Sequence, residues 1–398
     1  MAIPGKHASG LLVCLITGWG GSSLANDIGQ NSGPVEFEGT GFFSLTVGKM
    51  LSGTKGRAND TQCPCFISDY AQAGVYTGKS GLQWQPDSKL GLQGSLLFSD
   101  TPFSLTGQVV ARGAHDGAVN LEWLYGNYKI NDAFTLQLGR KRLPMFFNSD
   151  AQDIGFALPW THLPPQLYGW EAVNYNGANL TWNKPLDHGW HLVANLLAGA
   201  ETVKESGYWK MYRGPNNRTD VKWDNILGGD LNLSNDWLET RLVYIQSHTR
   251  QRNVNGSWDQ TLQAYDPTTI ENNYSNNARQ QIYGLAFNID RDNWLLKSEF
   301  IHINRPGDVF KDQAQIVAVG RRIGQWQPML TWSNYRAITA DPTQKEAHFD
   351  IAASLRYELD TSSAVKIQID DQHSRSGPSF QPQYGDARLL TFSYDRVF

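Results

Sequence analysis

The sequence predicts an all-β protein that crosses a membrane as a closed, antiparallel up-and-down barrel of 16 strands. Three observations lead to this fold class. Short segments alternate between apolar and polar residues, the polar faces carry charges that the apolar faces lack, and short turns alternate with long loops along the chain. A face that combines Asp, Arg, Glu and Lys cannot line a dry core, because unpaired buried charge costs too much, but it can line an aqueous lumen.

Composition and the first residues agree with an exported protein. The chain has 398 residues, of which 18% are charged and 12% aromatic, and no apolar run reaches the ~20 residues of a transmembrane helix. Residues 1–25 resemble a secretory signal peptide, with Lys6, an apolar stretch over 11–19 and cleavage before Asn26. Residues 26–398 then form the barrel domain. Loss of Lys6 takes the formal charge from −4 to −5, which offers no basic surface for nucleic acid.

The predicted strands are segments in which every second residue is apolar. The clearest is 347–359, where Phe349 and Ile351 alternate with His348 and Asp350. In the segment 119–126 the same pattern puts Val119, Leu121, Trp123 and Tyr125 on one face, whereas 315–322 shows no clear alternation. The remaining clear segments are 90–98, 103–112, 133–142 and 364–371.

The connections between these segments set the strand number. Seven short turns, rich in Asp, Asn, Gly, Ser and Pro, alternate with eight longer polar loops. Together they join 16 strands and place the N- and C-terminal ends of the barrel domain on the periplasmic side, with the long loops outside. Residues 73–84, within the first loop, could add a hairpin and raise the number to 18. The turns are 100–102, 130–132, 184–189, 234–236, 290–293, 324–325 and 360–363; the loops are 50–89, 113–117, 143–168, 200–222, 249–277, 304–312, 337–346 and 374–386.

Two stretches carry a resemblance to a known family. The segment "ARLLTFSYDRVF", with Phe392, Tyr394 and Phe398, resembles the C-terminal signature that barrel-assembly machinery recognises in outer-membrane proteins. The segment "YGNYKINDAFTLQLGRKRLP" resembles the strand–turn–strand that precedes the third loop of Gram-negative porins. As a pattern, the resemblance covers all of 26–398 and identifies no subfamily. It implies a location in the outer membrane in contact with lipid, a homotrimer, and a third loop, residues 143–168, that folds into the pore.

The resemblance also implies a pore constriction, in which acidic residues of the third loop face basic residues of the wall. The candidates are Asp150 and Asp153 on the loop, with Lys141 and Arg142 at the preceding strand end. Phe146, Phe147, Phe156 and Trp160 of the same loop are expected to pack it onto the wall. Strand parity predicts that a further set of charged residues lines the lumen: Arg241, Lys297, Glu299, Asp350, Arg356, Glu358, Lys366 and Asp370.

Cysteines and histidines give little sign of a cofactor. Cys63 and Cys65, in "TQCPCF", are either bonded to each other or two free thiols, since an exported protein meets an oxidising compartment. A metal site would need further Cys or His residues at ligand spacing, and "HGWH" at 188–191 lacks a third ligand. We therefore expect no metal and no cofactor.

The function that these features predict is passive diffusion of ions and small hydrophilic solutes, without catalysis. One alternative is a substrate-selective channel with a binding site in the constriction. Others are a barrel enzyme and an adhesin, because the loops 50–89, 200–222 and 249–277 are long enough for surface roles. Neighbouring Ser and His residues such as Ser247 and His248 point to opposite faces of a strand, which weighs against an enzyme. The sequence names neither the solute nor a preference for cations or anions.

Overall fold

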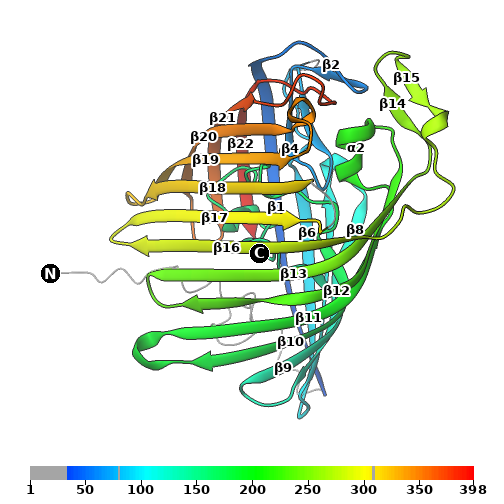
Figure 1. Cartoon of the computed structure of the whole chain (residues 1–398). Coiled ribbons are helices and arrows are strands. Elements are labelled where there is room, and N and C mark those ends of the chain that lie inside the picture. The colour runs from blue at the N-terminus through cyan, green and yellow to red at the C-terminus, as the bar shows by residue number, and fades with distance from the viewer. Residues whose placement is uncertain (1–33, 79–80, 307–309) are drawn as a thin grey trace.

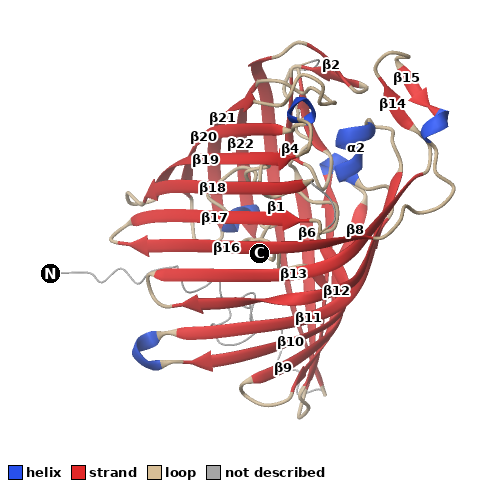
Figure 2. Cartoon of the chain, viewed as in Figure 1, coloured by secondary structure: helices blue, strands red, loops and turns tan. Residues whose placement is uncertain are grey.

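The structure, a computed structural model, describes residues 34–78, 81–306 and 310–398; the predicted signal peptide lies outside the described residues. Within the described residues, sixteen strands form one closed antiparallel barrel, as predicted (Figures 1 and 2). The barrel strands are β1 (Val35–Gly53), β6 (Lys89–Phe98), β7 (Phe103–Arg112), β8 (Val119–Lys129), β9 (Phe134–Arg142), β10 (Asn174–Pro185), β11 (His191–Val203), β12 (Thr219–Ser234), β13 (Leu238–Asn253), β16 (Ala278–Arg291), β17 (Trp294–Asn304), β18 (Lys311–Arg321), β19 (Trp326–Ile338), β20 (Ala347–Glu358), β21 (Ser363–Ser374) and β22 (Ala387–Val397).

Strand β1 closes the barrel, because it pairs with β6 on one side and with β22 on the other. Phe398 extends the second pairing through two backbone hydrogen bonds with Gly41, of 2.7 and 2.9 Å. A Cβ atom at Gly41 would lie 2.5 Å from the Phe398 ring, so the ring can pack there because residue 41 has no side chain. Tyr394 packs against Phe43 at 5.6 Å between ring centroids. The aromatic residues of the resemblance thus lie at the closing seam.

The outer surface carries an apolar band. Outward side chains such as Leu45, Leu138 and Leu196 are exposed, the last to 67%. Pairs of aromatic rings flank the band: Trp326 and Tyr357 at the end with the short turns, and Tyr244 and Tyr283 towards the other end. This arrangement is that of a barrel embedded in the outer membrane, with lipid against the band. Separately, no helix in the described part of the chain is long and apolar enough to cross a membrane.

The alternation of short turns and long loops is confirmed, with the turns at one end of the barrel (the left and lower edges of Figure 1). The longer connections at the other end carry small elements of their own. These are β2 (Gly56–Ala58), β3 (Thr61–Cys63), β4 (Cys65–Asp69), β5 (Gly74–Thr77), helix α2 (Gly207–Arg213), β14 (Ser257–Asp259) and β15 (Ala264–Asp266).

The 18-strand alternative is wrong for the described chain. Residues 74–77 do form a strand, β5, but it pairs with β4 in a separate two-stranded sheet. The hairpin has no barrel edge to join, because β1 already pairs with β6 directly. Cys63 and Cys65, which precede and begin β4, are bonded to each other.

The predicted faces of the segment 119–126 need a correction. Val119 and Leu121 are exposed on the outer surface as expected, but Trp123 is buried and Tyr125 half-buried inside. The pairing of β7 with β8 shifts beside Glu122, as at a β-bulge, and the extra residue reverses the parity of everything that follows. A period-two pattern cannot reveal such an insertion.

Strand β18, where the sequence showed no clear alternation, is regular in the structure. Asp312, Ala314 and Ile316 point inward and are buried, whereas Val317 and Val319 are exposed outside. The pattern was obscured because both faces are mostly apolar. An apolar inner face in this part of the barrel also shows that something other than water covers it.

Candidate functional site

The third loop, residues 143–173, covers that apolar inner face. It is longer than the predicted 143–168 and includes a single turn of 3₁₀ helix, Gly155–Ala157. Trp160 is fully buried, and its Nε1 donates a hydrogen bond to Thr331 of β19 at 2.8 Å. Phe146 is also buried and packs against Tyr168 at 5.0 Å. Trp160 and Phe146 both join the core that the loop forms with the wall, whereas Phe147 and Phe156, expected to pack in the same way, are half-buried.

A hydrophobic core forms inside the barrel where the loop meets the wall. The loop contributes Leu143, Met145, Phe146, Leu158 and Trp160. Burial of these side chains, at roughly 1.5–3 kcal/mol for each large one, holds the loop on this side. The wall contributes inward side chains of β12 to β18, which include Val221, Ile226, Val243, Ile245, Ile282, Ile301, Ile303 and Ile316.

Charged side chains of the wall also bind the loop. Arg241 donates to the carbonyl oxygens of Phe146 and Phe147, at 3.0 and 3.2 Å. Glu299 accepts from the Phe147 amide at 2.8 Å and from the Tyr168 hydroxyl at 2.6 Å. Both wall residues are buried. Their charged groups make strong hydrogen bonds to the loop, which offset part of the cost of burial.

Two cations further round the barrel do the same at the tip of the loop. The Lys366 ammonium donates to the carbonyl oxygens of Gly155 and Trp160, at 2.8 and 2.5 Å, and forms an ion pair with Asp395 at 3.0 Å. Arg356 donates to the carbonyl of Leu158 at 3.1 Å and to that of Phe156. These inward charges thus lie beneath the loop, where they meet backbone carbonyls in place of open water.

His162 of the loop lies between two carboxylates. Its Nδ1 is 3.5 Å from Asp87, and its Nε2 is 3.5 Å from Asp370. Burial alone would lower the pKa of His162, but Asp370 and Asp87, with Asp350 nearby, outweigh burial and raise it to about 9. The imidazole is therefore positively charged at neutral pH and offsets part of the negative charge of these aspartates.

Two of the predicted lumen residues differ from this group. Lys297 is only half-buried, and its ammonium lies 5.9 Å from the centre of the Phe147 ring. Glu358 lies at the end of β20, with its side chain 48% exposed and 3.4 Å from Arg356. The other six, Arg241, Glu299, Asp350, Arg356, Lys366 and Asp370, are buried on the inner face.

The predicted constriction residues separate into two places. Asp153 and Arg142 are buried together, 2.6 Å apart. Arg112 lies 2.8 Å from Asp153 and 2.6 Å from Glu122, and Lys89 completes the group at 3.8 Å from Asp153. Burial opposes ionisation of Asp153, but the three cations outweigh it and hold the pKa of its carboxyl well below the usual range. This cluster fixes the base of the loop to β6, β7, β8 and β9.

Sequence reasoning missed three members of this cluster. Arg112 and Lys89 stand at strand ends, and each shares the parity of inward residues on its own strand. Parity alone would have found both. Glu122 could not be placed, because it lies at the bulge of β8.

Lys141 and Asp150 lie apart from the buried cluster and are half-buried. The Lys141 ammonium lies 5.0 Å from the Tyr125 ring and contacts the side chain of Gln137. Asp150 is near enough to act electrostatically on Lys141, Tyr125 and Tyr175. This pair stands on the side of the barrel that the third loop leaves accessible.

The accessible side carries a row of polar groups, all uncharged except Asp230, which we call the polar belt. From β7 to β12 its side chains form a continuous chain of hydrogen bonds: Asn127 donates to Ser104 at 3.0 Å, Gln137 to Asn127 at 2.7 Å, Asn179 to Gln137 at 3.1 Å and to Asn195 at 3.3 Å, and Asn195 to Asp230 at 3.2 Å. The belt comprises Gln93, Ser95, Ser104, Thr106, Gln108, Asn127, Gln137, Asn179, Thr181, Asn195, Asp230 and Asn232.

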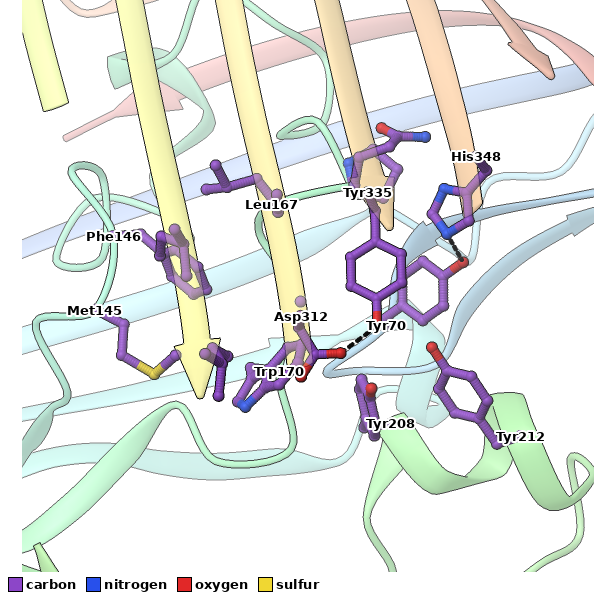
Figure 3. Close-up of a pocket in the computed structure, with 16 residues that line it drawn as sticks. Tyr70, Met145, Phe146, Leu167, Trp170, Tyr208, Tyr212, Asp312, Tyr335 and His348 are labelled. Carbon is purple, nitrogen blue, oxygen red and sulfur yellow. Dashed lines mark hydrogen bonds between the residues drawn. The ribbon is translucent and has the colours of Figure 1, made fainter. Parts of the chain in front are cut away.

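A small cavity lies at the outer mouth, between the third loop, α2, the first loop and the wall (Figure 3). Tyr208 and Tyr212 of α2 face Tyr70 and Tyr335, and the Tyr335 hydroxyl donates to Asp312 at 2.6 Å. The cavity has a volume of about 20 Å³, room for about one water molecule. It is an internal packing gap of the covered side.

Comparison with known proteins relates the chain to solved structures alone. No family model matches the sequence, and no curated protein matches it. Similar structures include the outer membrane channel DcaP of Acinetobacter baumannii, with TM-score 0.54 and 9% identity over 92% of this chain and 99% of that one. A loop-deletion form of OmpT, an outer membrane protein of Vibrio cholerae, gives 0.55 and 9% over 92% and 100%.

A third similar structure is OmpF of Salmonella typhi in complex with daunomycin, with TM-score 0.51 and 11% identity over 92% of this chain and 98% of that one. The fold is that of a porin-like outer-membrane barrel. At these identities the likeness concerns the path of the chain, and no residue of the polar belt or of the anchoring clusters is assigned through it. Among the described residues, no group of three or more His, Cys, Asp or Glu side chains is placed to hold a metal.

Proposed function

We propose that the barrel is an outer-membrane channel for passive diffusion of ions and small hydrophilic solutes. The observation that carries the proposal is the polar belt, a hydrophilic inner wall on which most side chains stay half-exposed beside the loop-covered wall. Gln137 and Asn195, for example, keep solvent contact, whereas inward Thr331 and Ser333 of the opposite wall are buried under the third loop. A loop fixed to one wall fills part of the lumen of a wide barrel, and a polar opposite wall can line the part that stays open to water.

The alternative of a barrel enzyme finds no support in the residue pair considered from the sequence. Ser247 is buried on the inner face of β13 and accepts a hydrogen bond from Gln280 at 2.8 Å. His248 follows it on the opposite face, so its ring cannot serve as a base for that hydroxyl. We therefore propose transport without catalysis.

The test of the proposed function is electrical. Purified, heat-modifiable protein in planar bilayers under a KCl gradient should give discrete conductance steps and a definite reversal potential. Silent bilayers, from protein whose unboiled gel band shows an intact barrel, would contradict the proposal.

We also propose that the barrel assembles as a homotrimer and is inserted by barrel-assembly machinery. The first part is supported by the wide apolar outer surface and by the fold's likeness to OmpT, which has been solved in a trimer form at TM-score 0.51 and 8% identity. The second is supported by Phe392, Tyr394 and Phe398 at the seam. Light scattering of the detergent-extracted protein should give three chains per particle, and a monomer would contradict the first part.

A further inference from the structure

The polar belt has a chemistry that points to one class of solute. Its members are side-chain amides and hydroxyls, and every such group both donates and accepts hydrogen bonds. The one carboxylate among them, Asp230, lies 3.5 Å from the guanidinium of Arg241, which neutralises it. A wall of this kind can replace the water around a neutral hydroxylated molecule bond for bond. It offers an ion no compensating charge.

The belt is also held in place before any solute arrives. The two N–H groups of the Asn179 amide lie within hydrogen-bond distance of three acceptors, on Gln137, Thr181 and Asn195, at 3.1, 2.9 and 3.3 Å. Thr181 donates in turn to Asn195 at 2.7 Å. Since each bond runs to a neighbouring strand or to the next inward position of the same strand, the row follows the inner circumference from β7 to β12. Groups fixed in this way lose little further freedom when they bind, which favours recognition.

Some hydrogen-bonding capacity along this wall is unused. Asp230 is 5% exposed and bonds through Oδ2, while its Oδ1 has no partner. Asn183, two residues beyond Thr181 on β10, leaves its side-chain oxygen unpartnered as well. Buried polar atoms without partners are rare in native structures, so these two oxygens show where the wall has hydrogen-bonding capacity left over.

Aromatic rings stand at the outer end of the belt. Tyr125 on β8 is half-buried, whereas Tyr175 on β10 is fully buried, and Lys141, between them on β9, contacts Gln137 of the belt. A ring face beside fixed amides suits a molecule that has an apolar C–H face and a hydroxylated edge. Sites for small molecules generally combine apolar or aromatic walls with a few placed polar groups in this manner.

We propose that the polar belt is a binding track for neutral polyhydroxylated solutes, the class of mono- and oligosaccharides. The inference rests on the proposed channel function and specifies what the channel selects. The solute hydroxyls exchange hydrogen bonds with water for bonds with the belt, while the half-buried Tyr125 orients the solute ring at the outer end.

The test is block of ion current by maltose in planar bilayers, compared with a polyethylene glycol of similar size. In the wild-type protein, maltose should reduce the current with saturation, and the polymer without saturation. Gln137→Leu with Asn179→Leu should raise the half-blocking maltose concentration about tenfold or more, because two hydrogen bonds are lost. Thr135→Val, on the same strand but outside the hydrogen-bonded chain, should leave it unchanged.

The outcomes separate the two proposals. Open channels that maltose blocks no more than the polymer does would overturn the inference and leave the channel function intact. Silent bilayers would overturn both. If the leucine variant loses its heat-modifiable band, Gln137→Met alone provides the comparison, and saturable block with an unchanged half-blocking concentration would again overturn the track.

Discussion

The two sides of the barrel interior carry similar polar residues, but those residues have different surroundings. On β6 to β12 the inward Ser, Thr, Asn and Gln side chains bond to one another, and most of them, such as Gln137 and Asn195, keep solvent contact. On β19 to β22 and β1, inward polar residues such as Thr46, Ser333 and Thr391 are fully buried. Polarity is therefore not what distinguishes the two sides. What differs is the covering segment: the third loop packs over one wall through carbonyls and aromatic rings, whereas it meets the other through the Asp153 cluster at the ends of β6 to β9.

The largest loss of stability should come from Asp153→Asn, which removes the carboxylate that holds the third loop to β6, β7 and β9. Asp153 compensates Arg112, Arg142 and Lys89, and its loss leaves three cations facing Glu122 alone. Breaking a buried ion pair from one side costs about 3–5 kcal/mol. We expect the unboiled gel band to convert at a lower temperature and the single-channel current to become larger and noisier, as the loop loses its attachment to β6, β7 and β9.

Asp150→Asn is the matched control for that variant. It is the same substitution, three residues away on the same loop, but Asp150 is half-buried and outside the cluster. Its gel band should convert at the wild-type temperature. Equal destabilisation by both variants would show that the loop is not held through Asp153.

Lys366→Met should have the next largest effect, because it acts on the tip of the loop. The variant leaves the fully buried Asp395 without its cation, and it removes the hydrogen-bond donor of the Gly155 and Trp160 carbonyls. A second substitution, Asp395→Asn, should restore part of the stability, because it removes the unpaired charge. The measurement is the conversion temperature of the gel band for both single variants and the double one. A double variant no more stable than Lys366→Met would contradict the pairing.

A change of pH should alter the stability of the loop's attachment by a smaller amount, through the titration of His162. Its pKa is raised to about 9 from an unfolded value near 6.5, so its contribution is complete below about pH 6.5 and is lost as pH rises through 9. The contribution is at most about 3 kcal/mol. Loop attachment should weaken over this window, seen as current noise that rises between pH 7 and 10. His162→Gln should be noisier at pH 7 and change little with pH; a dependence equal to the wild type would assign the titration elsewhere.

The difference between the two sides explains what the sequence could predict. The barrel, its turns and its loops follow from a period of two and from turn residues, because lipid and water impose opposite demands on alternate positions. Strand segments such as 347–359 and 103–112 were therefore placed within a residue or two. The inward parity of Arg241 and Lys366 was equally readable.

The partners of those residues were not readable, because they depend on how the third loop folds. Parity says that Lys366 points inward, but only the loop's path shows that it meets the Gly155 carbonyl in place of water. The loop's path depends in turn on contacts between distant segments, such as Trp160 with Thr331. The apolar inner face of β18 was a usable signal, since an aqueous lumen would not favour Ala314 and Ile316 there.

The smallest predicted effect concerns ion preference on the accessible side. Asp150 acts on Lys141 beside the outer end of the polar belt, so Asp150→Asn leaves the ammonium less compensated. Across a partly screened, half-exposed site the change should be about twofold in relative anion permeability, read from the reversal potential under a KCl gradient. Asp132→Asn, in an exposed periplasmic turn, serves as the control. An unchanged reversal potential would mean that ions pass away from Lys141, and the conducting path would then have to be drawn along the part of the belt nearer the periplasm.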